Sequence, residues 1–298
     1  MMPSPTAELE PPSCPLCGAS EVRTRFREGE HRIEDCCSCG VTFVHPRRSA
    51  GELLDEVYDS TYWRSPHPRL RGYADYAGDG ALHLRTFGRR LRVLGPHLPP
   101  PGKALDVGCA GGHWVKTLLE AGWDARGLEP SAAIAAGARE LLGERLLEGT
   151  LDSSELDGEQ LDLITLWDVI EHLPAPLAAL ERARDLLRPG GRLILETQDL
   201  GAPLARLLGR RWHHFKHDEH LVHFDARTLR AALERAGLRV VRLQRRGAGK
   251  FVRGEFLVER SARLHRGLPG LLRPVLGGSW SLYVNPLDEW IAIAERPR

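Results

Sequence analysis

The sequence predicts a protein of the α/β class whose main domain is a doubly wound, mostly parallel sheet. Ala104–Val107 is a short apolar strand that leads into a glycine-rich turn, and a helical pattern follows from Trp114 to Ala121. Trp123–Glu129 is a second strand, and Leu161–Asp168 is a nearly continuous apolar run. Strands that are apolar on both faces are typical of parallel sheets, which helices cover on both sides.

The turn Gly108–Gly112 carries so few side chains that a ligand can lie directly against its backbone. About twenty residues later Glu129 ends the second strand, where an acid can accept hydrogen bonds from both hydroxyls of a ribose. A dinucleotide-binding turn requires the pattern G-x-G-x-x-G, but Ala110 and His113 occupy two of the three glycine positions. The turn therefore predicts a nucleoside ligand, and a strand–turn–helix corner without any ligand is the alternative.

Asp106, Gly108, Ala110 and Gly112 resemble motif I of the Rossmann-like S-adenosylmethionine-dependent methyltransferases, with Ala110 in place of the middle glycine. Two later segments resemble the same family: Asp168–His172 matches its D-x-x-E-H segment, and Leu187–Gly191 matches its L-x-P-G-G turn. The resemblance covers residues 101–245 with the landmarks in order. It implies a Rossmann-like, seven-stranded methyltransferase sheet, and Leu238–Arg246 and Trp290–Glu295 fit its last two strands.

The same resemblance implies that S-adenosylmethionine is the methyl donor. The residues expected to bind it belong to the glycine turn and to neighbouring strand ends: Asp106, Gly108, Cys109, Ala110, Gly112, Glu129, Pro130, Asp152, Trp167 and Asp168. Leu146–Asp152 is expected to be a third strand that ends at Asp152, from which the carboxylate would reach an adenine amino group. Cys109 is expected to be a small packed residue rather than a reactive thiol.

Two C-x-x-C-G motifs precede this domain and are separated by 18 residues. Four thiolates at this spacing suit a tetrahedral, structural zinc ion, and a disulfide pair or an iron site of the rubredoxin kind are the alternatives. No signal peptide or long apolar stretch precedes the cysteines, which favours a reducing, cytoplasmic compartment and zinc. The predicted ligands are Cys14, Cys17, Cys36 and Cys39, whereas Cys37 is the extra cysteine of the second motif.

These features divide the chain into a disordered tail (1–12), a zinc-ribbon module (13–46), a helical connector (47–100) and the methyltransferase core (101–298). In the connector, Ser49–Glu52 is a capping box, and apolar residues from Leu84 to Leu98 recur at helical spacing. Its aromatic residues form either a lid over the cofactor cleft or a packing layer between module and core: Tyr58, Tyr62, Trp63, Tyr73 and Tyr76. An insertion at about 250–288 either shapes the acceptor pocket or forms an oligomer contact.

Histidines gather in the loop before the helix that Asp225 caps, with five in the eleven residues from His213 to His223. No pair has a recognised zinc-binding spacing on a helix, so a metal site is not expected there. Loops after the fourth and fifth strands face the ligand crevice of such a sheet. His172, His220 and His223 are therefore the candidate general bases, in falling order of placement, and a purely structural role is the alternative for each.

Composition agrees with an enzyme that acts on a small molecule. The chain has 41 basic and 40 acidic residues among 298, so no overall positive field favours nucleic acid, and no run of about 18 apolar residues predicts a membrane span. We expect methyl transfer to a hydroxyl of a sugar, lipid or natural product. The alternatives are a C-methyltransferase acting on a nucleotide-sugar, an RNA or protein methyltransferase, a non-catalytic S-adenosylmethionine-binding scaffold and, more distantly, a nicotinamide dehydrogenase. The acceptor and the oligomeric state are not predicted.

Overall fold

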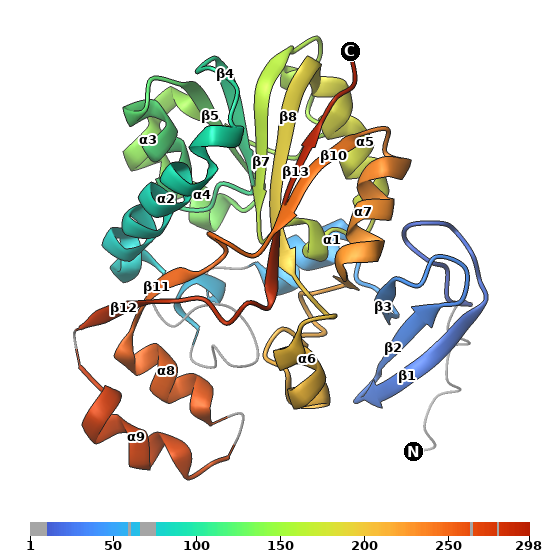
Figure 1. The fold of residues 1–298 in the computed structure, drawn as a ribbon, viewed down its shortest axis with the longest axis vertical. Helices are drawn as coiled ribbons and strands as arrows, with labels where there is room; N and C mark the ends of the chain where they lie inside the picture. Colours follow the sequence, from blue (N-terminus) through green and yellow to red (C-terminus); the bar gives the residue numbers. More distant parts are fainter. Residues whose placement is uncertain (1–10, 59–60, 66–75, 263–264, 279) are drawn as a thin grey trace.

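The computed structural model describes residues 11–298 except 59–60, 66–75, 263–264 and 279, so most of the expected tail and Tyr73 lie outside the described residues. Its centre is a seven-stranded sheet in the order β10-β13-β8-β7-β4-β5-β6, in which β13 runs antiparallel to both of its neighbours (Figure 1). The strands, in chain order, are β4 (Lys103–Val107), β5 (Asp124–Glu129), β6 (Leu146–Glu148), β7 (Leu161–Trp167), β8 (Leu187–Gln198), β10 (Arg239–Gln244) and β13 (Glu289–Glu295). The predicted doubly wound, seven-stranded sheet is confirmed.

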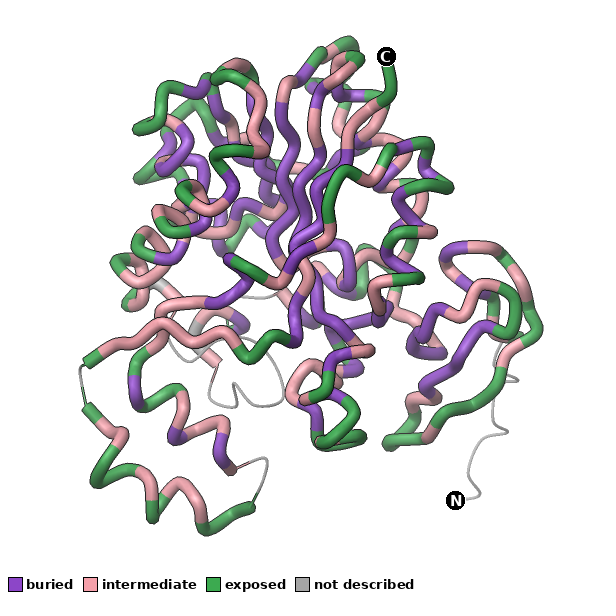
Figure 2. Tube along the Cα trace, viewed as in Figure 1, coloured by how far each residue is buried: buried purple, intermediate pink, exposed green. Residues whose placement is uncertain are grey.

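Helices cover both faces of this sheet (Figure 1). One face packs against α2 (Gly80–Leu94), α3 (His113–Glu120) and α4 (Ala132–Leu142), and the other packs against α5 (Pro176–Leu186) and α7 (Ala226–Arg235). The central strands are buried along most of their length, whereas the outer sides of the helices are exposed (Figure 2). Burial on both faces explains why β7 is an almost uninterrupted apolar run.

The third strand is shorter than the sequence predicts. It ends at Glu148, because Gly149 has a φ of +151° and the chain then turns, with the Ser153 N–H donating to the Thr150 carbonyl at 3.0 Å. Asp152 consequently lies in an exposed turn beyond the sheet rather than at the end of a strand.

The N-terminal residues form a separate small sheet of β1 (Val22–Glu28), β2 (His31–Cys36) and β3 (Thr42–His45). A fourth strand, β9 (Val222–His223), pairs with β3 and comes from the histidine loop of the large domain. The chain then passes through α1 (Ala50–Glu52), whose capping box is confirmed, and a π-helical turn (Leu53–Val57). Short 3₁₀ turns at Tyr62–Arg64 and Ala77–Asp79 lead towards α2.

Between β10 and β13 the chain leaves the central sheet and returns to it. β11 (Lys250–Arg253) pairs antiparallel with β12 (Ser281–Val284), and α8 (Gly254–Ser261) and α9 (Leu268–Leu276) lie between them (Figure 1). A shorter helix, α6 (Pro203–Leu208), follows β8. Among the helices that the structure describes, none is long and apolar enough to cross a membrane.

Candidate active site

A cavity of about 680 Å³ opens at the carboxyl ends of β4, β5 and β7. One part of its wall is the glycine turn after β4, with Glu129 at the end of β5 and Pro130 directly after it. The opposite part comes from the loop after β7, the histidine loop, β11 and α8. The sequence left two roles open for the insertion, and the structure places residues from its first part, between 250 and 260, in the wall of this cavity.

The glycine turn adopts left-handed backbone conformations that favour glycine. Gly108 has a φ of +66°, and a Cβ atom added there would lie 2.7 Å from a methyl carbon of Val169. Ala110 has a φ of +46°, so the residue that replaces the middle glycine sits in a conformation that costs a side chain about 1–2 kcal/mol. The backbone of this turn is therefore left uncovered where it borders the cavity.

Two buried carboxylates, those of Glu129 and Asp106, are held by hydrogen bonds at this end of the cavity. Glu129 accepts hydrogen bonds from the backbone N–H groups of Ala110 and Ser131, each at 2.9 Å, and burial raises its pKa to about 7. Asp106 accepts a hydrogen bond from Thr165 Oγ1 at 2.6 Å, and burial raises its pKa to about 8. Because each Glu129 oxygen has a second lone pair, the carboxylate can still accept hydrogen bonds from a ligand.

The structure places most, but not all, of the predicted cofactor residues in the cavity wall. Eight line it: Asp106, Gly108, Cys109, Ala110, Glu129, Pro130, Trp167 and Asp168. Cys109 is buried, and burial raises its pKa, so it is a neutral thiol. Gly112 instead precedes α3 as its N-cap and faces the Leu142 side chain. Thr150 lines the cavity where Asp152 was expected.

Two sets of ion pairs that the sequence did not predict lie beside Trp167, and only the first is fully buried. The Arg90 guanidinium on α2 donates to Glu196 on β8 at 2.5 Å and lies 4.6 Å from the Trp167 ring centroid. Lys250 Nζ donates to Asp168 at 2.7 Å and to Glu289 at 3.1 Å. Burial alone would lower the pKa of Lys250, but these two carboxylates hold it well above its ordinary value.

Two of the three predicted bases meet in the cavity wall. The His172 and His220 rings are perpendicular, with centroids 4.7 Å apart. His220 Nδ1 lies 2.7 Å from the carbonyl of His214, which can only accept, so Nδ1 carries the hydrogen and Nε2 keeps the lone pair. His172 Nδ1 lies 2.7 Å from the hydroxyl of Tyr58. Burial lowers the pKa of both rings, so both are neutral at pH 7.

His223 lies elsewhere. It belongs to β9, does not line the cavity, and its Nδ1 accepts a hydrogen bond from Gln198 Nε2 at 3.2 Å. Burial lowers its pKa to about 3. His223 therefore braces the contact between the small sheet and β8 rather than facing a ligand.

Aromatic residues of the connector close the cavity opposite the sheet. The Tyr58, Tyr62, Trp63 and Tyr76 rings follow one another at centroid distances of 5.0, 4.9 and 5.2 Å, and all four line the cavity. The Ser131 hydroxyl donates to the Tyr58 carbonyl at 3.0 Å, which ties this segment to the strand end that carries Glu129.

The four predicted metal ligands form one group. Cys14 Sγ lies 3.5 Å from Cys39 Sγ, and Cys17 Sγ lies 3.5 Å from Cys36 Sγ. These are non-bonded separations, close to those of sulfurs around a tetrahedral ion with bonds of about 2.3 Å. Burial would raise the pKa of Cys36, but the Cys39 backbone N–H and the nearby thiols bring it to about 7. The donor set and its spacing are compatible with zinc, and Cys37 is exposed outside the group.

Comparison with known proteins identifies the fold and the family. The sequence profile of the methyltransferase domain family matches residues 81–243. The chain belongs to this methyltransferase family. Curated ubiquinone biosynthesis O-methyltransferases are similar to it, including those of Xanthomonas axonopodis pv. citri (31% identical over 145 residues, 43% of this chain and 61% of the relative) and Methylococcus capsulatus (30% over 134 residues, 41% and 56%). The methyltransferase thus spans about three fifths of the length of the curated relatives that it matches.

Solved structures support the same fold. A chain from the complex between the Haloferax volcanii Trm112 methyltransferase activator and a methyltransferase superposes with a TM-score of 0.51 and 16% identity, covering 74% of this chain and 95% of that one. An S-adenosylmethionine-dependent methyltransferase from Archaeoglobus fulgidus superposes with a TM-score of 0.50 and 17% identity, covering 77% and 97%. At these identities the comparison establishes the fold alone.

Proposed function

We propose that this methyltransferase transfers a methyl group from S-adenosylmethionine to a hydroxyl of a small-molecule acceptor such as a sugar, a lipid or a natural product. One observation carries the proposal: a single cavity joins the glycine turn and Glu129 to the His172–His220 pair. The proposed donor site and a proton acceptor therefore share one cavity. The curated O-methyltransferase relatives support oxygen as the atom that is methylated.

The donor would lie against the glycine turn. Gly108 and Ala110 leave the backbone uncovered, and the buried Glu129 carboxylate is aimed by two backbone N–H groups so that it can accept the ribose hydroxyls. When bound, S-adenosylmethionine supplies a methyl group that its positive sulfur already makes electrophilic. The protein has only to hold the acceptor in line and to exclude water, which the connector aromatics over the cavity favour.

The hydroxyl of the acceptor must lose its proton, and His220 is the residue that we assign to this step. Its tautomer is fixed by the His214 carbonyl, so Nε2 is available to accept a proton. His172 and the Tyr58 hydroxyl lie on the adjoining wall and would orient the acceptor. This order differs from the sequence ranking, in which His172 came first.

We also propose that the four cysteines hold a structural zinc ion. A Cys₄ set leaves no open position for chemistry, so the ion would stabilise the small sheet. That sheet pairs with β9, directly after His220, and the Leu221 N–H donates to the Glu171 carbonyl at 2.8 Å. The zinc module would thereby support the loop that carries the proposed base.

Calorimetric titration of S-adenosylmethionine and S-adenosylhomocysteine tests the donor site. We expect micromolar binding that Glu129→Ala weakens by more than tenfold, or about 1.4 kcal/mol. Glu148→Ala is the matched control, because Glu148 is paired with Glu129 in the sheet register but has a half-exposed side chain. Absence of binding to the folded protein would refute the proposal, whereas donor binding without turnover of any acceptor would favour the non-catalytic, S-adenosylmethionine-binding scaffold.

Release of S-adenosylhomocysteine in the presence of a panel of phenols, sugars and hydroxylated lipids tests the chemistry. With an accepted substrate, His220→Gln should lower kcat at least a hundredfold, because general-base catalysis contributes about 10²–10⁴-fold, and donor affinity should stay unchanged. Full activity in His220→Gln would transfer the role of base to His172.

A further inference from the structure

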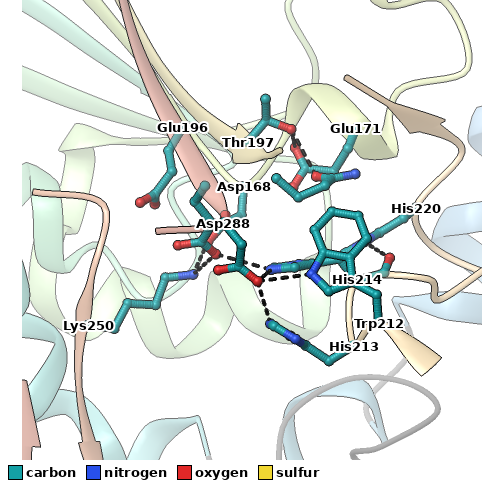
Figure 3. Close-up of polar contacts among 12 residues, drawn as sticks. Asp168, Glu171, Glu196, Thr197, Trp212, His213, His214, His220, Lys250 and Asp288 are labelled. Atoms are coloured by element: carbon teal, nitrogen blue, oxygen red, sulfur yellow. Dashed lines mark hydrogen bonds and ion pairs between the residues drawn. The ribbon is translucent and has the colours of Figure 1, made fainter. Parts of the chain in front are cut away.

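We propose that His213, His214 and Asp288 bind a divalent transition-metal ion at the acceptor end of the cavity. No local pattern in the sequence predicts this site, because its carboxylate comes from the far side of the insertion. The three side chains each offer one ligand atom, and these atoms all lie within 4.8 Å of one another. They converge from two segments, the start of the histidine loop and the residue before β13 (Figure 3).

The distances between the two histidine nitrogens and the Asp288 carboxylate fit ligands of a shared ion better than they fit direct hydrogen bonds. His213 Nε2 lies 3.7 Å and His214 Nε2 lies 3.8 Å from Asp288 Oδ2, beyond hydrogen-bond range. Two ligands at about 2.1 Å from a tetrahedral ion lie roughly 3.4 Å apart, so a small inward shift closes the site. His214 Nε2 is buried without a hydrogen-bond partner, a costly arrangement that an ion would relieve.

Neighbouring groups hold the carboxylate in position, as the outer contacts of metal ligands generally do. Trp212 Nε1 donates to Asp288 Oδ2 at 2.9 Å, and the Asp199 N–H donates to the Asp288 carbonyl at 2.7 Å. Trp212 directly precedes the two histidines, and its buried ring packs against that of His214 with centroids 4.9 Å apart. Trp212 therefore positions both the carboxylate and the neighbouring imidazole of the site.

Charged groups of both signs lie near the site: the cations Lys250 and Arg260 act on His214, and the Glu289 carboxylate lies beside it. Among the described residues, Lys250 donates to Asp168 and Glu289 but not to Asp288. Glu289 Oε1 lies only 3.7 Å from His214 Nε2, which adds a second carboxylate beside the histidines. Two imidazoles and a carboxylate are a ligand set that zinc and iron(II) favour.

The open side of the site faces the cavity. His213 and His214 line the cavity wall, whereas Asp288 is buried behind them. Three protein ligands leave coordination positions for water or for an oxygen of a bound molecule. In one respect the inference rests on the proposed function: an acceptor hydroxyl bound there would lie beside His220, whose ring centroid is 5.9 Å from that of His214.

A second group, Glu171, His172 and His220, also comes within ligand distance, and each of its members already makes a hydrogen bond through one atom. Glu171 accepts from Thr197, His172 contacts Tyr58, and His220 Nδ1 is bound to a carbonyl. This group is therefore the alternative metal site, and the experiment must distinguish it from the site at His213, His214 and Asp288.

The test counts metal ions in protein whose cysteine site is first loaded with zinc. Cobalt(II) is then titrated and followed by visible absorption and by elemental analysis. We expect one further equivalent whose spectrum lacks thiolate charge-transfer bands. His214→Gln and Asp288→Asn should weaken this equivalent at least tenfold, and the matched control His217→Gln, a loop histidine that faces Glu28, should keep it.

His213→Gln provides a second variant in case Asp288→Asn does not fold, because the His213 side chain is 27% exposed. The inference is overturned if the wild type takes up no further cobalt, if both His213→Gln and His214→Gln retain it, or if only His172→Gln loses it. Titration of S-adenosylmethionine on the same samples separates the proposals. Donor binding without a second metal ion refutes the metal site alone, and a second metal ion without donor binding refutes the methyltransferase proposal alone.

Discussion

The buried pair between Arg90 and Glu196 makes a quantitative prediction about stability. Both side chains are almost completely inaccessible to solvent, at 2% and 0% exposure. At their separation of 2.5 Å, an effective dielectric constant of about 20 gives an attraction of roughly 7 kcal/mol. Most of this attraction offsets the cost of removing both charges from water, so the pair adds little net stability.

Removing only one partner of this pair should strongly destabilise the protein. Arg90→Met leaves the Glu196 carboxylate buried without its cation, which typically costs about 3–5 kcal/mol. Burial already raises the pKa of Glu196, with Asp168 and Glu289 adding to that effect and Arg90 opposing it, so the variant raises this pKa further. The protonated acid is then the form that the native state prefers. The loss of stability in Arg90→Met should accordingly be small near pH 4, where carboxyls of the unfolded chain are protonated, and it should grow as the pH rises.

Urea unfolding of Arg90→Met, Glu196→Gln and the double variant at pH 5 and 8 measures this effect. The double variant should recover at least 1 kcal/mol relative to Arg90→Met alone, because it removes the unpaired charge. A single-variant cost below 1 kcal/mol at pH 8, or a cost that does not change with pH, would refute the reasoning.

Three further predictions concern the cofactor end and the cysteines. Stripping metal with a strong chelator should lower Tm and methyl transfer while changing donor affinity less than about threefold, because β3 supports the His220 loop rather than the glycine turn. Gly108→Ala should cost about 1–3 kcal/mol in urea unfolding and weaken donor binding about tenfold, whereas Gly122→Ala, with a φ of +86° but open space around it, should show the backbone cost alone. Burial raises the pKa of Glu129 to about 7, so the native state binds a proton that the unfolded chain releases above about pH 4.5, and stability should fall between pH 4.5 and 7. Thermal unfolding across that range should show a smaller decline for Glu129→Gln, and an unchanged decline would contradict the assignment.

Local sequence signals were sufficient to place most of the proposed donor residues in the wall of one cavity. The strand, glycine turn and helix around Gly108 are adjacent in the chain, and the acid that ends β5 follows from the spacing of two strands. The seven-stranded sheet followed from the resemblance to a family. Each strand and turn at this end of the cavity is a local pattern of the kind that periodicity and turn chemistry cover, whereas the sheet as a whole required the ordered landmarks of the resemblance over residues 101–245.

The acceptor end depends on contacts that no local pattern encodes. Arg90 and Glu196 are 106 residues apart, and Trp212 and Asp288 are 76 residues apart. His220 and His223 look equivalent in the sequence, but residues three apart in an extended chain point to opposite sides, so only His220 lines the cavity. Asp152 was misplaced because one glycine with positive φ ended the strand early.

The pairing of β11 with β12 has a consequence for how this enzyme could acquire new substrates. Because these strands are neighbours, the two ends of the 250–284 segment lie side by side, and everything between them can be exchanged without moving β10 or β13. The exchanged part includes residues 251–260 of the cavity wall, whereas Asp106, Glu129 and the glycine turn belong to other elements. Selection, or a protein engineer, can therefore replace this part of the cavity wall as one unit and leave the proposed donor residues unchanged.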